Sequence, residues 1–207
     1  MFLIRDATVE DAIGIAKVHV NTWKSAYAGI IPSEYLARLS WEESAHRLQE
    51  YLQNMEPECF LLVAEREGEI VGFSSGGPER SGDEVYRGEI YALYVSPAYQ
   101  RRGIGRRLVG ASARRLLQAG TGNLLVWVLS ANPSRQFYER LGGQLVRERE
   151  IEIGEVSLPE VGYGWADLEA LASMDYGGES TQSAINLTSD LNASPLISCT
   201  RPASGCR

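Results

Sequence analysis

The sequence is poor in the residues that bind metals or form disulfides. Its 207 residues include only three cysteines and two histidines. Cys59, Cys199 and Cys206 follow no zinc-ligand spacing, and an odd cysteine count is typical of a reducing compartment. The first residues contain no apolar segment of the kind found in signal peptides. No metal site is predicted, and a cytoplasmic location is expected.

Long apolar runs and an excess of positive charge are also missing. No run is long enough to span a bilayer, so no membrane association is expected. The net charge of -7 argues against general nucleic-acid binding, because proteins of that class usually carry a basic surface. A chain of 207 residues with a hydrophobic share of 44% instead predicts one globular domain with a substantial core.

Aromatic residues are absent from the C-terminal end. From Gly177 to Arg207 there is no Phe, Trp or Tyr, the charges sum to zero, and Ser, Thr and Asn dominate. Such a segment buries too little apolar surface to offset the entropy lost on ordering. We therefore expect a folded domain over residues 1–168 and a low-complexity polar tail over 169–207, which is predicted to be disordered.

The spacing of apolar residues, glycines and prolines predicts the order of elements. Helices are expected to start near Thr8, Pro32, Trp41, Gly103 and Asn132. The segment 76–88 is predicted to be a loop, because it is rich in Gly, Ser, Pro and charge. Strands are expected over 2–5, 60–64, 70–74, 89–95, 124–129, 144–153 and 155–165. This order is typical of a mixed α+β sandwich with helices on a central sheet.

The most specific motif is the glycine-rich turn Gln100–Arg106, which joins the strand 89–95 to a helix. The first backbone N–H groups of a helix have no intrahelical partner, and the positive end of the helix dipole lies beside them. Gly103 and Gly105 let a ligand approach the main chain closely. The turn therefore predicts a site for a phosphate or pyrophosphate.

Arginines gather around this turn on an otherwise acidic chain. Arg101, Arg102 and Arg106 lie in the turn, and such a local basic patch fits a small anionic ligand. Arg114 and Arg115, further along the helix, also fit a solvated helix face.

Three stretches of the chain resemble the GCN5-related N-acetyltransferase (GNAT) superfamily. They are Glu89–Gly105, similar to the family's acyl-CoA motif, Asn132–Gly143, similar to its late helix, and Trp23–Pro32, found in many bacterial members. The resemblance runs from about Phe2 to Trp165 and leaves the tail outside. It implies a central, mostly antiparallel sheet flanked by helices, with a V-shaped opening for acyl-CoA.

The resemblance further implies direct transfer of an acetyl group from acetyl-CoA to a primary amine. Asn132 would contact the pantetheine arm. The main chain of Leu93, Tyr94 and Val95 would pair with that arm as a strand does. The pyrophosphate would be held by backbone groups of Gln100, Arg101, Arg102, Gly103, Ile104, Gly105 and Arg106.

Direct transfer needs a base for the amine and a proton donor for the leaving thiolate. The resemblance places Tyr138 near the CoA sulfur as the donor, and a tyrosine pKa of ~10 lies close enough to a thiol's ~8.5. Glu89, at the start of the central strand, is the candidate base, acting through a water. Simpler interpretations stay open: Tyr138 as core packing, Asn132 as a helix cap and Glu89 as a surface carboxylate.

Two other functions also stay open. A GNAT-fold module can bind acyl-CoA without catalysis, although the presence of both Tyr138 and Glu89 disfavours it. Alternatively, an interaction protein could dock an acidic partner on the arginines. The amine acceptor, a small molecule or a peptide, is not identified. Segments 23–52 and 76–88 are expected to contact it, and the acidic Glu79, Asp83 and Glu84 favour a cationic one. Frequent dimers in the superfamily make a homodimer a candidate assembly.

Overall fold

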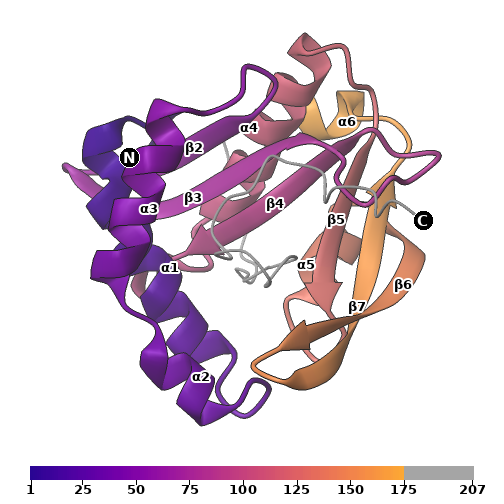
Figure 1. Cartoon of the computed structure of the whole chain (residues 1–207). Coiled ribbons are helices and arrows are strands. Elements are labelled where there is room, and N and C mark those ends of the chain that lie inside the picture. The colour runs from indigo at the N-terminus through magenta and orange to yellow at the C-terminus, as the bar shows by residue number, and fades with distance from the viewer. Residues whose placement is uncertain (175–207) are drawn as a thin grey trace.

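A seven-stranded sheet crosses the molecule in the computed structural model, which describes residues 1–174 (Figure 1). The strand order is β1-β2-β3-β4-β5-β7-β6. Every neighbouring pair is antiparallel except β4 and β5, which run parallel. The strands are β1 Leu3–Asp6, β2 Phe60–Arg66, β3 Glu69–Pro78, β4 Gly88–Val95, β5 Leu124–Leu129, β6 Gln144–Ile153 and β7 Val156–Trp165. The mostly antiparallel α+β sheet predicted from the sequence is confirmed.

Helices cover both faces of the first half of the sheet. In the described residues they are α1 Ala12–Ala26, α2 Ser33–Arg38, α3 Trp41–Gln53, α4 Ile104–Gln118, α5 Arg135–Arg140 and α6 Glu169–Ala172. α1 packs on β3 and β4 and carries α3 on its outer side, whereas α4 packs on the opposite face, against β2, β3 and β4 (Figure 1). Within residues 1–174, no helix is both long and apolar enough to cross a bilayer.

The central strand β4 is buried along its whole length, because helices cover it on both sides. Ile90, Leu93 and Val95 join the core cluster beneath α4. Ala92 and Tyr94 join the second cluster, beneath α1. A strand covered on both faces is apolar at successive positions rather than at alternate ones, which explains the run Ile90–Val95.

Strand β3 is longer than the sequence predicted. The expected loop 76–88 begins only after Pro78, because Gly76 and Gly77 continue β3 and pair with Ile90 and Glu89. A Cβ on Gly76 would lie 2.5 Å from Phe60 Cζ and 2.6 Å from the carbonyl oxygen of Glu89. Glycine is therefore required there by a close approach and does not mark a turn.

Folded structure also continues beyond residue 168. Leu171 on α6 is 1% exposed and belongs to the core cluster beneath α4. Arg114 Nη1 donates to the carbonyl oxygen of Ala172 over 2.7 Å, which anchors the end of α6. The domain therefore extends past the expected boundary at 168, while the polar segment from Gly177 lies outside the described residues.

Candidate active site

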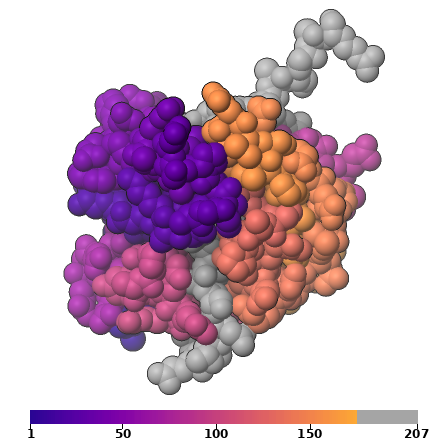
Figure 2. All heavy atoms as spheres, turned by 90° about the horizontal axis from the view of Figure 1, so that it is seen from below, coloured from indigo at the N-terminus to yellow at the C-terminus, as the bar shows by residue number. Residues whose placement is uncertain are grey.

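The two halves of the sheet meet at a short parallel junction and then diverge. β4 and β5 pair only at Gly88–Ile90 with Leu124–Val126. β4 continues to Val95, whereas the described pairings of β5 beyond Val126 are with β7 (Figure 1). Leu93, Tyr94 and Val95 thus lie on the diverging part of β4, at the opening implied by the resemblance. Figure 2 shows the N-terminal segment and the segment of β5–β7 on opposite sides of the molecule.

The glycine-rich turn lies just past the end of β4. Two of its residues adopt left-handed backbone angles, Arg101 with φ 61° and Gly103 with φ 77°. Within residues 1–174, the N–H groups from Arg101 to Arg106 donate to no backbone oxygen, and the first N–H bond of α4 runs from Arg107 to Gly103. Successive amides turned by left-handed residues form a concave anion site. The structure therefore provides the row of N–H groups that the sequence predicted.

Gln100 differs from its neighbours. Its N–H contacts the carbonyl oxygen of Pro97 over 3.4 Å, and its Nε2 donates to the carbonyl oxygen of Val95 over 3.1 Å. Its main-chain donor is engaged within the fold, so Gln100 supports the shape of the turn.

The arginines around the turn fall into two groups. Arg101, Arg102 and Arg106 are exposed in the turn itself. Those further along α4 contact the fold: Arg107 donates to the carbonyl oxygen of Phe2, and Arg115 forms a salt bridge with Asp6. The charge that can meet an anion at the turn therefore comes from the first group.

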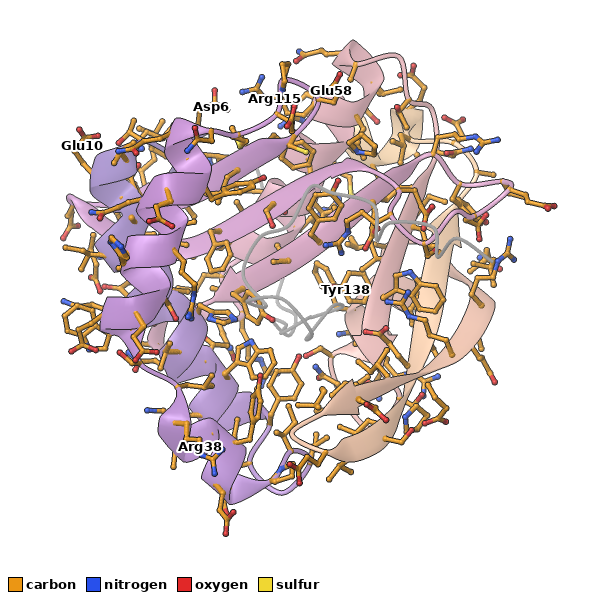
Figure 3. All side chains as sticks on the ribbon, viewed as in Figure 1. Asp6, Glu10, Arg38, Glu58, Arg115 and Tyr138 are labelled. Carbon is orange, nitrogen blue, oxygen red and sulfur yellow. The ribbon has the colours of Figure 1, made fainter. Side chains whose placement is uncertain are left out.

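Tyr138 lies on α5 between β4 and β5 (Figure 3). It is fully buried, with its ring centroid 5.1 Å from that of Phe137, 6.0 Å from Tyr163 and 6.1 Å from Trp165. Its hydroxyl has no hydrogen-bond partner among residues 1–174. Burial, with a further contribution from Tyr27, raises the pKa of Tyr138 well above the ordinary tyrosine value. The hydroxyl therefore keeps its proton at neutral pH.

Asn132 links α5 to the end of α1. Its Oδ1 accepts from the N–H of Ser134 over 2.9 Å, as a cap does, and its Nδ2 lies 3.4 Å from the hydroxyl of Tyr27. Asn132 is 2% exposed and Tyr27 is fully buried. Tyr27 lies in the segment 23–52 that the sequence predicted to contact the acceptor, where it fits either the lining of that pocket or packing in the core. The structure brings it to Asn132 and Tyr138.

Glu89 is buried in a salt bridge that sequence reasoning missed. Its Oε1 lies 2.6 Å from Arg80 Nη2, and its Oε2 accepts from Arg80 Nε over 3.2 Å. Glu89 is 2% exposed and Arg80 is 5% exposed, so the interpretation of Glu89 as a surface carboxylate is wrong. The Arg80 guanidinium carbon lies 3.8 Å from the centroid of the Tyr91 ring. No sequence spacing indicated Arg80, because it lies in the segment read as a loop.

The other acidic residues of that segment are also engaged. Glu79 accepts from the backbone N–H groups of Ser81 and Gly82, over 2.6 and 2.8 Å. Asp83 forms a salt bridge with Arg147 at 2.7 Å. Of the three acids expected to attract a cation, only Glu84 is an exposed side chain.

Comparison with known proteins agrees with this architecture. The family model for the acetyltransferase (GNAT) family matches residues 22–143. The "Uncharacterized N-acetyltransferase YuaI" of Bacillus subtilis is 40% identical over 174 residues, which are 84% of this chain and 98% of the relative.

Two solved structures share the fold. YncA of Salmonella typhimurium, a putative acetyltransferase solved with acetyl-CoA, aligns with a TM-score of 0.62 and 24% identity over 85% of this chain and 99% of the other. The PaiA N-acetyltransferase of Thermoplasma acidophilum, solved with coenzyme A, aligns with a TM-score of 0.58 and 22% identity, over 77% of this chain and 98% of the other. The family model matches residues 22–143, and YuaI is 40% identical over 98% of its own length. The chain therefore belongs to the acetyltransferase (GNAT) family.

Proposed function

We propose that this protein is a cytoplasmic N-acetyltransferase that moves an acetyl group from acetyl-CoA directly to a primary amine. The observation that carries the proposal is the row of N–H groups from Arg101 to Arg106, which lies just past the end of β4, the strand that diverges from β5 after Ile90. Tyr138, whose hydroxyl has no hydrogen-bond partner among residues 1–174, is seen between the same two strands in Figure 3. An anion site and a buried proton donor in the same domain suit a pyrophosphate-bearing thioester.

The residues present fit acetyl-CoA as the donor. The pyrophosphate would bind the N–H groups of the turn, helped by the exposed Arg101, Arg102 and Arg106. The pantetheine arm would lie along Leu93–Val95, where β5 no longer pairs with β4 in the described structure. YncA was solved with acetyl-CoA and PaiA with coenzyme A, which supports the same choice here.

In the proposed transfer, Glu89 acts as the base and Tyr138 as the proton donor. The ammonium form of the acceptor loses a proton to Glu89 through a water, and the free amine nitrogen attacks the thioester carbon. A C–N bond forms as the C–S bond breaks, and Tyr138 protonates the departing sulfur. The tyrosinate then takes the second proton of the former amine, so the products are the amide and the free thiol.

Binding and turnover are tested separately on the full chain. Calorimetry with acetyl-CoA should give a dissociation constant in the micromolar range, and thiol release should then be measured over a panel of amines. No heat at millimolar acetyl-CoA would refute the proposal. Binding without thiol release from any amine would instead indicate an acyl-CoA-binding module.

Assembly is a separate part of the proposal. A homodimer is expected from the superfamily resemblance alone, and light scattering of the purified chain measures it directly. A single species of monomer mass at micromolar concentration would contradict it.

A further inference from the structure

Three arginine–carboxylate pairs lie on the second half of the sheet and beside it. Their closest N–O distances are 2.6 Å for Arg80–Glu89, 2.7 Å for Arg147–Asp83 and 2.9 Å for Arg149–Glu160. Each arginine also lies over an aromatic ring. The guanidinium carbon is 3.8 Å from the centroid of Tyr91, 5.8 Å from Tyr86 and 3.9 Å from Trp127, respectively. We call these pairs and rings the arginine–carboxylate face.

The strand register places these groups on one side of the sheet. Glu89 is paired with Leu125, and Trp127 follows two residues later on β5, so the three side chains share a face. Trp127 is paired with Gly162, which is paired in turn with Arg147. Their neighbours Ile90 and Val126 belong to the cluster beneath α4, on the opposite side. The arginine–carboxylate face therefore borders the place where β4 and β5 diverge.

The net charge of this face is zero, since three guanidiniums meet three carboxylates. A polycationic acceptor would approach carboxylates that already contact arginines and would be repelled by the same guanidiniums. The expectation of a cationic acceptor, drawn from Glu79, Asp83 and Glu84, is therefore not supported by the pairs that form. A zwitterion brings no net charge to the face and can match a carboxylate and a guanidinium together.

Two further side chains offer hydrogen-bond donors there. The hydroxyl of Tyr51 on α3 and Nε1 of Trp127 are buried and have no partner in the part of the chain that the structure describes. Indole nitrogen only donates. Burial raises the pKa of Tyr51 to about 12, against a smaller opposing influence of Arg80, so its hydroxyl stays protonated. Tyr51 packs against the core cluster beneath α1, which includes Leu129, two residues after Trp127 on β5, and Arg149 lies over the Trp127 ring, so both donors lie on this side of the sheet.

We propose that the acceptor is a primary amine with a carboxylate close to its amino group, as in a free α-amino acid. The amino group would face Glu89, and the carboxylate would accept from Tyr51, Trp127 and the guanidinium of Arg80. Buried donors without partners are costly, and an oxyanion is the ligand group that satisfies several at once. This inference rests on the proposed function, because it names the substrate class of the same site.

Matched amines test the inference on the full chain with saturating acetyl-CoA. Each pair consists of an amino acid and the amine left when its carboxyl is removed, such as L-methionine with 3-(methylthio)propylamine and L-phenylalanine with phenethylamine. We expect kcat/KM to be at least about tenfold higher for the amino acid, as for a hydrogen bond to a charged group. Equal values, or a preference for the plain amine throughout, would overturn the inference while leaving the proposed function intact.

Two conservative variants locate the effect. Tyr51→Phe removes one donor and keeps the ring, and Trp127→Phe removes the other donor and keeps an aromatic side chain. Each should raise KM for the amino acid roughly tenfold while changing KM for the matched amine by less than about twofold. Trp41→Phe is the matched control, because Trp41 begins α3 and contacts Lys17, away from the face. Variants that raise both KM values equally would contradict the assignment of the two donors.

Calorimetry on the CoA-loaded protein separates the two proposals. Titration with both members of a pair measures acceptor binding without any need for turnover. Tighter binding of the amino acid supports the inference even when no thiol is released, in which case the proposed function alone fails. Equal or absent binding of both members overturns the inference.

Discussion

Replacing His19 by Leu should flatten the dependence of stability on pH. His19 lies on α1 and is 1% exposed, with ring centroids of Tyr94 at 5.1 Å and Trp23 at 5.4 Å. Neither of its ring nitrogens has a hydrogen-bond partner among residues 1–174. Burial, with a smaller contribution from Arg47, lowers the pKa of His19 to about 3. The imidazole is therefore neutral in the folded protein at any ordinary pH.

The magnitude follows from the difference between the folded and unfolded pKa values. An unfolded histidine has a pKa of ~6.5, so the unfolded chain takes up a proton as pH falls below that value while the folded chain does not. Because the folded pKa is lowered, the stabilisation is present above pH ~6.5 and is lost as pH falls toward ~3. Between pH 7.5 and 5.5 the expected loss in free energy of unfolding is about 1.3 kcal/mol.

Urea unfolding of the wild type and His19→Leu at pH 7.5 and 5.5 measures this loss. Any packing change caused by leucine is the same at both pH values, so it cancels from the comparison. The wild type should lose about 1.3 kcal/mol more than the variant over this interval. The control is His46→Gln, since the His46 side chain is 74% exposed. Identical pH dependence in the wild type and His19→Leu would refute the reasoning.

Four further predictions concern the site and the domain boundary. Gly103→Val and Gly120→Val place a branched residue at φ 77° and φ 80°, so each should cost about 1–2 kcal/mol of stability. Only Gly103→Val should also weaken acetyl-CoA binding more than about tenfold in calorimetry; equal affinities would show that the turn is misassigned. Tyr138→Phe should lower kcat about 100-fold with acetyl-CoA affinity unchanged, and an unchanged kcat in the thiol-release assay would remove Tyr138 from the mechanism. Glu89→Gln should likewise lower kcat about 100-fold, whereas a change confined to the acceptor KM would show that Glu89 only holds its arginine. Leu171→Ala should cost about 2–4 kcal/mol in urea unfolding, because this side chain is 1% exposed; a change below about 0.5 kcal/mol would place α6 outside the cooperative unit.

Local pattern predicted most elements of the fold. The apolar run of β4, the glycine at Gly103 and the spacing of Leu108 and Leu116 on α4 each depend on residues close in sequence. Periodicity and turn chemistry report such features, because they reflect which side a residue buries and which backbone angles it tolerates. The same is true of the turn at Gly154, where φ is 55°.

Contacts set by register were out of reach of such patterns. Arg80 meets Glu89 only because Gly77 pairs with Glu89 across β3 and β4, which brings Arg80, two residues past the end of β3, beside Glu89. The sequence of the segment, rich in glycine and charge, predicted a loop and a cationic ligand instead. Propensity describes single residues, whereas a salt bridge depends on two strands having one particular alignment.

The residues of the candidate site also fall into those that a local motif marks and those that only the structure indicates. A motif marks the turn Arg101–Arg106 and Tyr138, and their roles in binding and catalysis stay predictions. Tyr51 and Trp127 lie in a helix and a strand whose sequences mark no function. The role proposed for them rests on buried polar atoms that have no partner among residues 1–174, which only a three-dimensional structure reveals.

The short parallel junction of the sheet makes this domain a natural candidate for splitting. Cutting the connection at 121–123 would leave β1–β4 with α4 in one piece and β5–β7 in the other. Every strand pairing except that of β4 with β5 would then remain inside a single piece. The separated pieces would meet again through these three residue pairs, the contact of α6 with α4, the Asp83–Arg147 salt bridge and the two core clusters that they share. A ligand that contacts both pieces would then promote their reassociation, so the split domain could report on ligand binding.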